Sequence, residues 1–148
     1  KFSAKSSCTV YYLYKSRKEI KMQKLYEGTI ADESFLNPAP KSAIIIAWED
    51  GAKFMYPIAK KLYKKGSEVD VILGFSDISQ VEMECEFAAI SDRLYVMTEN
   101  GTHGANATIC EAFQEMMIDK PDSEMVFFSC PKAINEQLLK IAKSENFS

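Results

Sequence analysis

The chain has 148 residues, of which 47% are hydrophobic and 26% are charged. These are ordinary values for a folded globular protein, so the composition argues against disorder and against a membrane span. With 18 basic and 21 acidic residues, the formal net charge is -3. Such a balance provides no basic surface for nucleic acid or for an anionic membrane, and we expect neither as a partner.

The cysteines and the histidine form no metal-binding pattern. Cys8, Cys85, Cys110 and Cys130 are far apart and include no CxxC pair, and His103 is the single histidine. Zinc sites and iron–sulfur clusters that can be read from local sequence need closely spaced ligands, so we expect no metal site. Reduced thiols are typical of cytoplasmic proteins, and this is the location that we expect.

The start of the chain indicates two antiparallel strands. Residues 8–14 (CTVYYLY) and 18–26 are rich in strand formers or alternate polar with apolar residues, with a turn near Ser16 and Arg17. A pair of strands is marginal alone, so it must pack on the following domain or on a sheet whose other strands lie elsewhere. Because the sequence opens on Lys1 rather than Met, we expect a fragment of a longer protein.

Prolines separate these strands from the rest of the chain. Pro38 and Pro40, within NPAP, disfavour both a helix and a central strand. We therefore predict a linker over residues 37–41, between a β segment at 1–36 and an α/β domain at 42–148.

After the linker, strands and helices alternate. Short apolar runs predict strands buried on both faces of a sheet at 43–47, 69–73, 94–98 and 125–129. Apolar residues at helical spacing predict helices over 55–62, ending at Gly66, and over 79–90, 109–116 and 134–142. This order predicts a doubly wound α/β domain with a parallel sheet and helices on both faces.

Ligands of such sheets bind at the carboxyl ends of the strands, which here selects the loops 48–54, 74–79, 98–104 and 129–133. The helix start at Gly51 could hold a phosphate through backbone N–H groups. Glu49 and Asp50 would repel that phosphate if they faced it, or they could instead cap the helix. The capping interpretation is favoured by their position.

Two further side chains have two interpretations each. His103, in TENGTHG, could donate a proton or bind a ligand, or it could be an exposed turn histidine. Cys130 precedes a helix, whose N-terminus could lower the thiol pKa and make this residue reactive, or it could be a small packing residue at a crowded turn.

Several of these segments resemble a known family. The strand AIIIA, the following helix MYPIAKKLYKKG, VILGF, EF, VMTENGTHG and SCP occur in the order found in the pyridine-nucleotide-binding domain of ferredoxin–NADP reductase-like flavoproteins. The resemblance is nearest to the electron-transfer subunit of dihydroorotate dehydrogenase and to gamma-type subunits of sulfide dehydrogenases and hydrogenases. It covers residues 43–141 and implies the α/β fold predicted above.

The resemblance also implies cofactors, partners and site residues. It implies NAD(P) at this domain, FAD on a β-barrel of which residues 1–36 would be the last strands, and other subunits or domains of a redox complex as partners. Cys130 would be the catalytic residue near the nicotinamide. The implied cofactor-binding residues are Gly51, Gly74, Phe75, Thr98, Gly101, Gly104, Ser129, Cys130 and Pro131.

Departures from the family pattern leave the function divided between alternatives. Ala47, Trp48 and Glu49 stand where the family has three glycines, and Ser129 aligns with the family's cysteine. The chain is thus either a nicotinamide-nucleotide domain of a flavoprotein oxidoreductase or a divergent copy that acts as a structural or docking module. An unrelated α/β domain of flavodoxin or response-regulator type is a third interpretation.

Overall fold

The computed structural model describes residues 9–16, 19–26, 30–31, 33–119 and 123–144. Six strands form one mixed sheet in the order β2-β1-β6-β3-β4-β5. The strands are β1 (Val10–Ser16), β2 (Glu19–Leu25), β3 (Ser42–Trp48), β4 (Glu68–Phe75), β5 (Arg93–Thr98) and β6 (Met125–Ser129). Strands β6, β3, β4 and β5 are parallel, as predicted.

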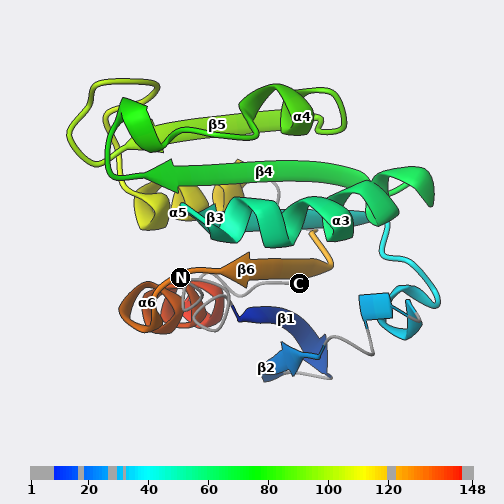
Figure 1. Cartoon of the computed structure of the whole chain (residues 1–148). Coiled ribbons are helices and arrows are strands. Elements are labelled where there is room, and N and C mark those ends of the chain that lie inside the picture. The colour runs from blue at the N-terminus through cyan, green and yellow to red at the C-terminus, as the bar shows by residue number, and fades with distance from the viewer. Residues whose placement is uncertain (1–8, 17–18, 27–29, 32, 120–122, 145–148) are drawn as a thin grey trace.

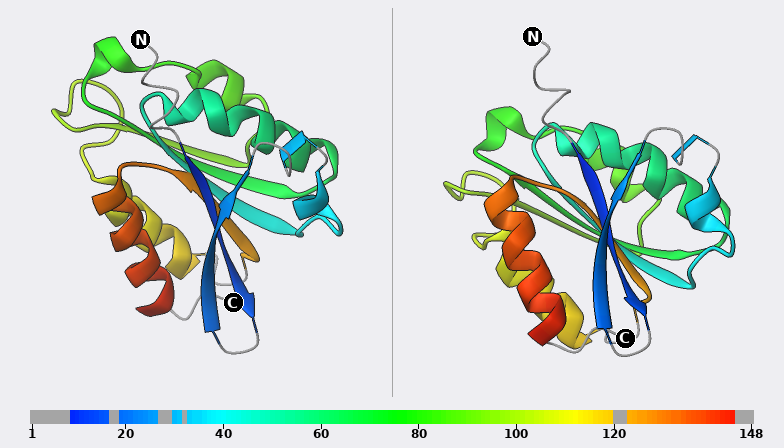
Figure 2. Two further views of the ribbon diagram at one scale, coloured as in Figure 1. Left: turned by 60° about the horizontal axis from the view of Figure 1, so that its bottom comes forward. Right: turned by 90° about the horizontal axis from the view of Figure 1, so that it is seen from below.

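Helices cover both faces of the sheet (Figure 1). They are α3 (Gly51–Lys64), α4 (Glu84–Ala88), α5 (Ile109–Asp119) and α6 (Lys132–Ser144), with short 3-10 turns η1 (Ser34–Leu36) and η2 (Ile78–Gln80). In Figure 2, α3 and α4 lie on one side of the sheet and α5 and α6 on the other. None of the described helices is long and apolar enough to cross a membrane.

The apolar strands divide their side chains between two cores. In β3, Ile45 packs in the core under α3, whereas Ile44 and Ile46 pack in the core under α5 and α6. Alternating side chains point to opposite faces of a strand, so a strand covered on both sides must be apolar throughout. This is why the short continuous apolar runs predict these strands correctly.

The predicted helix over 79–90 is wrong for most of its length. The structure has an α-helix only at Glu84–Ala88, and η2 precedes it. Met83 has a left-handed backbone, with φ 68°, which interrupts a right-handed helix. The Asp77 carboxylate accepts the Ser79 backbone N–H at 2.8 Å and so favours a tight turn there. Gly66, with φ 90°, ends α3 as predicted.

The two N-terminal strands extend the same sheet (Figure 2). Strand β1 is antiparallel to both β2 and β6, so the hairpin packs on the following α/β unit, which is the first of the two predicted arrangements. Leu13 of β1 is fully buried in the core under α5 and α6. The division into 1–36, 37–41 and 42–148, and the origin of the first part in a flavin barrel, stay predictions.

Candidate functional site

The carboxyl ends of the four parallel strands place their loops along one edge of the sheet, where two cavities open. The small cavity has a volume of about 250 Å³ and lies at the start of α3. It is lined by Trp48, Glu49, Asp50, Gly51, Ser129, Cys130 and Pro131. It therefore brings together four of the predicted site residues, Gly51, Ser129, Cys130 and Pro131.

The large cavity has a volume of about 490 Å³ and lies where the loops after β3, β5 and β6 meet the start of α5. Its lining residues are Trp48, Met97, Glu99, Asn106, Ala107, Thr108, Ile109, Cys110, Glu111, Pro131, Ile134 and Gln137. Trp48 and Pro131 line both cavities, which are therefore neighbours.

Gly51 is needed for packing of α3 on the sheet. A Cβ atom at this position would lie 2.4 Å from the Ser129 carbonyl oxygen of β6. In nucleotide-binding folds, one glycine of the turn serves this close approach of helix and strand, and others admit the pyrophosphate. Gly51 is thus a packing glycine, and Glu49 and Trp48 stand at the positions that would admit a ligand.

Glu49 occupies the turn itself. Its backbone is left-handed, with φ 49°, and its carboxylate accepts the Ser76 backbone N–H of the loop after β4 at 2.8 Å. Asp50 makes no side-chain cap hydrogen bond to α3. The predicted capping of α3 by these carboxylates is therefore wrong for Asp50, and the Glu49 carboxylate instead ties two loops together.

Trp48 is held over the end of β4 by Gly74. A Cβ atom at Gly74 would lie 2.8 Å from the indole Cε3 and 2.7 Å from the Ile109 side chain. The missing side chain therefore makes room for the indole and for the start of α5. Phe75 is fully buried in the core under α3. Its side chain therefore packs in that core and lines neither cavity.

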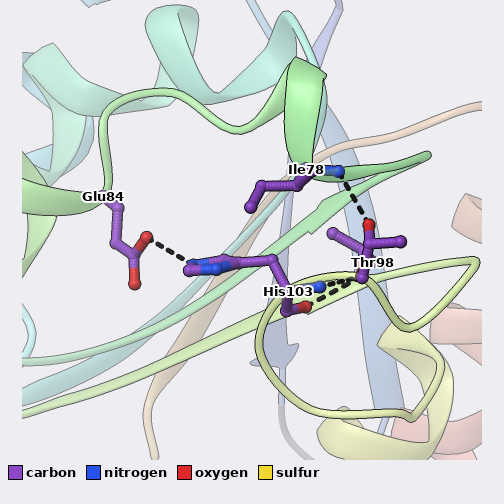
Figure 3. A network of polar contacts seen from close by, with 5 residues as sticks. Ile78, Glu84, Thr98 and His103 are labelled. Carbon is purple, nitrogen blue, oxygen red and sulfur yellow. Dashed lines mark hydrogen bonds and ion pairs between the residues drawn. The ribbon is translucent and has the colours of Figure 1, made fainter.

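The loop after β5 is closed by its own hydrogen bonds (Figure 3). The Thr98 hydroxyl donates to the His103 carbonyl at 2.8 Å and accepts the His103 N–H at 3.0 Å. The Ile78 N–H donates to the Thr102 hydroxyl at 3.0 Å. His103 Nε2 lies 2.9 Å from Glu84 Oε1, so the half-buried imidazole bridges this loop to α4.

Three predicted site residues belong to this closed loop rather than to the cavities. Thr98, Gly101 and Gly104 line neither of the two cavities. Gly101 and Gly104 have positive φ, and the loop returns to β5 through an Ala105 N–H to Val96 carbonyl bond of 2.9 Å. Their conformation serves the turn, and a ligand-binding role for them stays a prediction.

The thiol of Cys130 is poorly suited to ionise. Burial raises its pKa far above the ordinary range, and the neighbouring Cys110 raises it further, although a Ser129 backbone hydrogen bond lowers it. The side chain packs at the margin of the core under α5 and α6. These features favour the packing interpretation over a thiolate nucleophile, and the catalytic role of Cys130 stays a prediction.

The loops selected from the sequence contain Trp48, Glu99 and Pro131 of the large cavity, but the sequence patterns missed other lining residues, among them Asn106, Glu111 and Gln137. One signal was available, because TICE at 108–111 is a capping box. The Glu111 carboxylate accepts the Thr108 N–H at 2.9 Å, and the Glu111 N–H donates to the Thr108 hydroxyl at 3.1 Å. The capping box agrees with the helix start that apolar spacing predicts at residue 109, and it would have added Thr108 and Glu111 to the candidate residues at the edge of the sheet.

The edge fits a pyrophosphate poorly. No Lys or Arg lines either cavity among the described residues, and four carboxylates do: Glu49, Asp50, Glu99 and Glu111. An anion placed beside them would be repelled, and Glu49 already uses the Ser76 N–H. Within the described ranges, no three His, Cys, Asp or Glu side chains lie together as metal ligands.

Comparisons with known proteins were made on sequence and on structure. No family model matches the chain. Over 82 residues it is 30% identical to the electron transfer subunit of dihydroorotate dehydrogenase B (NAD(+)) from Geobacillus kaustophilus. The aligned region covers 55% of this chain and 32% of that protein. The corresponding subunit from Geobacillus sp. (strain WCH70) is 31% identical over 99 residues, or 66% and 37% of the two chains. The chain thus spans about a third of the length of these curated relatives.

Solved structures with the same fold have low sequence identity. The C-terminal domain of a hydrogenase from Pyrococcus furiosus aligns with a TM-score of 0.57 and 18% identity, over 70% of this chain and 85% of that domain. The cytochrome b5 reductase domain of Ulva prolifera nitrate reductase aligns with a TM-score of 0.54 and 10% identity, over 96% and 81% of the chains. An NADH-dependent reduced ferredoxin-NADP oxidoreductase gives a TM-score of 0.51 at 17% identity, over 86% and 58%.

These matches confirm the resemblance and the fold class predicted from the sequence. The chain has the α/β fold of ferredoxin–NADP reductase-like nucleotide-binding domains, and its sequence is similar to electron transfer subunits of dihydroorotate dehydrogenase B.

Proposed function

We propose that this chain is the nicotinamide-nucleotide domain of a flavoprotein oxidoreductase that passes electrons between NAD(P)H and a flavin or iron–sulfur partner. The observation that carries the proposal is the similarity to electron transfer subunits, which runs over as many as 99 residues. In this proposal the flavin is bound outside the α/β unit, and the partners are other domains or subunits of a redox complex in the cytoplasm.

The small cavity is the place at which a dinucleotide would have to bind. It lies at the start of α3, where the positive end of the helix dipole favours an anion. Ser129, Cys130 and Pro131 line its other side, and the sequence resemblance implies a position near the nicotinamide for this segment. The carboxylates of Glu49 and Asp50 oppose that binding, so we expect weak affinity.

One observation favours a second candidate function. The Glu49 carboxylate accepts the Ser76 N–H at 2.8 Å, in the turn where a ligand phosphate would need free donors. Because the Ser76 N–H is already hydrogen-bonded to the Glu49 carboxylate, the turn needs no bound phosphate to be stable. The second candidate is therefore a docking or structural module of a redox complex that has lost dinucleotide binding.

Calorimetric titration with NADH, NADPH and ADP-ribose at low salt separates the two candidates. We expect Glu49→Gly to bind these ligands more tightly than the parent chain by roughly tenfold, since it removes a charge near the phosphate. Glycine also tolerates the φ of 49° at this position, so the variant should fold. Glu49→Gln is the matched control, because it removes the charge and keeps the side chain.

The outcomes have distinct meanings. Heat from the parent chain, strengthened in both variants, supports the dinucleotide domain. Heat from Glu49→Gly alone would mean that the Glu49 side chain, and not only its charge, keeps the dinucleotide out of the turn. Absence of heat from all three folded proteins rejects dinucleotide binding and favours the docking module.

A further inference from the structure

A third cavity, which we call the hairpin cavity, lies between α6 and the β1–β2 hairpin. In Figure 2, α6 lies beside this hairpin. The volume of about 330 Å³ lies within the range of about 300 to 1,000 Å³ that is usual for ligand pockets. Among the described residues, the hairpin cavity shares no lining residue with the large cavity and only Cys130 with the small one. A ligand here would therefore be independent of a dinucleotide at the edge of the sheet.

Asn135 places a buried amide at this cavity. The residue is only 8% exposed, and its Oδ1 atom has no hydrogen-bond partner among the described residues. A buried amide without a partner is destabilising, whereas a leucine of similar volume would need no partner. Because Asn135 lines the hairpin cavity, a molecule with an N–H group in that cavity can supply the missing hydrogen bond.

Lys132 and Glu136 add one positive and one negative group to the lining. They are four residues apart on α6, so they lie on the same face of the helix, and both line the hairpin cavity. Both are exposed, and neither forms an ion pair with another described residue. A ligand with only one charge would be attracted by one of these groups and repelled by the other. A small zwitterion can pair with both.

Apolar surface forms a second part of the lining. Tyr11, Met22 and Leu139 line the cavity from β1, β2 and α6. The Tyr11 ring is held by stacking on Phe128, with ring centroids 5.8 Å apart. Met22 is 43% exposed although its side chain is large and apolar. An apolar group of the ligand would cover Met22, whose flexible thioether side chain adapts to such a group.

We infer that the hairpin cavity binds a free α-amino acid with an apolar side chain. The ligand carboxylate pairs with Lys132, at the start of α6, where the positive end of the helix dipole also favours an anion. The ligand ammonium pairs with Glu136 and donates to the Asn135 amide oxygen, and the apolar side chain of the ligand packs on Met22. The inference goes beyond the proposed function, because it requires neither a dinucleotide nor a flavin, and it holds for either candidate function.

Ligand-detected NMR with the whole chain tests the two charges of the ligand separately. L-leucine is compared with 4-methylpentanoate, which lacks the ammonium group, and with 3-methylbutylamine, which lacks the carboxylate. Saturation-transfer titrations give the dissociation constant of each compound. We expect saturable binding of L-leucine and roughly tenfold weaker binding of either analogue, since each loses one charge-assisted hydrogen bond. Glycine, which lacks the apolar side chain, should also bind more weakly than L-leucine.

Two substitutions assign the site. Asn135→Leu should weaken L-leucine binding by roughly tenfold without lowering the midpoint of thermal unfolding, because the amide oxygen that it removes has no partner among the described residues. Glu136→Gln should weaken L-leucine binding but strengthen binding of 4-methylpentanoate, because it removes a repulsive carboxylate. Glu136 is exposed, so this second variant should fold. Glu115→Gln is the matched control, since Glu115 is exposed on α5 and lines none of the three cavities.

Three results would overturn the inference. The first is the absence of saturation with L-leucine. The second is binding of 4-methylpentanoate or 3-methylbutylamine as tight as that of L-leucine, which would show an apolar cleft that does not select a zwitterion. The third is L-leucine binding that Asn135→Leu or Glu136→Gln leaves unchanged. None of these depends on the calorimetric titration of Glu49→Gly, so failure of the amino-acid site and failure of the dinucleotide turn can be told apart.

Discussion

Gly104 sits at the closest backbone approach of the loop after β5. Its φ is 71°, and an added Cβ would lie 2.1 Å from the Val96 carbonyl oxygen. Gly66 has a comparable φ of 90° but no atom within 4 Å of an added Cβ. The two glycines therefore separate the cost of backbone strain from the cost of overpacking.

We predict that Gly66→Ala lowers the free energy of unfolding by about 1 kcal/mol, the usual cost of alanine at positive φ. Gly104→Ala should cost about 1 to 3 kcal/mol more, because the methyl group must displace the β5 backbone. Urea unfolding of the two variants measures the difference. Equal losses would mean that the loop shifts away from β5 without cost.

Cys110 and Cys130 both have a raised pKa, caused first by burial. We predict that iodoacetamide at neutral pH modifies Cys85, which is exposed, well before these two. Peptide mass spectrometry after timed quenching gives the three rates, and the urea-unfolded chain is the control in which they converge. Fast modification of Cys130 in the folded chain would contradict the buried thiol.

The same shifts give a pH dependence of stability. A thiol whose pKa is higher in the folded than in the unfolded chain makes its full contribution to stability at pH values below its pKa in the unfolded chain. That contribution is lost as the pH rises above the ordinary thiol pKa, because the unfolded chain then ionises first. Cys130→Ala should therefore flatten the loss of stability on the alkaline side, as measured by urea unfolding at increasing pH.

At the scale of elements, an ion pair joins β4 to β5 near the amino-terminal ends of the two strands. Asp70 and Arg93 are cross-strand partners, and Arg93 Nε lies 3.7 Å from Asp70 Oδ1. Asp70 is only 2% exposed, whereas Asp119, the other partner of Arg93, has a side chain that is 55% exposed. The same guanidinium thus has one buried and one exposed carboxylate partner.

We predict that Asp70→Asn destabilises the protein by about 2 to 4 kcal/mol, since it leaves the partly buried Arg93 without its buried counter-charge. Asp119→Asn is the matched control and should cost less than about 1 kcal/mol, as exposed pairs do. Thermal unfolding at low and high salt measures both. A salt-sensitive loss for Asp70→Asn as small as that of the control would show that water reaches the pair.

Buried elements can be predicted from the sequence, whereas positions decided by one backbone conformation or by one contact between loops cannot. The four parallel strands follow from continuous apolar runs and the helices α3, α5 and α6 from apolar residues at helical spacing, because burial of these surfaces requires those patterns. The failure at 79–90 depends on the left-handed Met83, and the role of Glu49 depends on the Ser76 N–H of a loop distant in sequence. Neither the backbone conformation of Met83 nor the hydrogen bond between Ser76 and Glu49 has a sequence signal of its own.

At the scale of the whole molecule, the question is whether the β1–β2 hairpin and the α/β unit fold together. Tyr11 stacks on Phe128 of β6 with ring centroids 5.8 Å apart, and Tyr12 lies 5.9 Å from Phe127. Leu13 is fully buried in the core under α5 and α6. These contacts predict one cooperative unit, although the linker over 37–41 predicts a boundary.

Leu13 and Met22 are cross-strand partners of opposite burial and provide the test. We predict that Leu13→Ala lowers the free energy of unfolding by about 2 to 5 kcal/mol. Met22→Ala, at a side chain that is 43% exposed, should cost less than about 1 kcal/mol. Trp48 fluorescence is the readout, because this residue ends β3, outside the hairpin, and reports on the α/β unit. A shift of the Trp48 transition by Leu13→Ala means that the hairpin and the α/β unit unfold together. An unchanged Trp48 transition, with loss of strand signal in circular dichroism, would instead place a domain boundary at the linker.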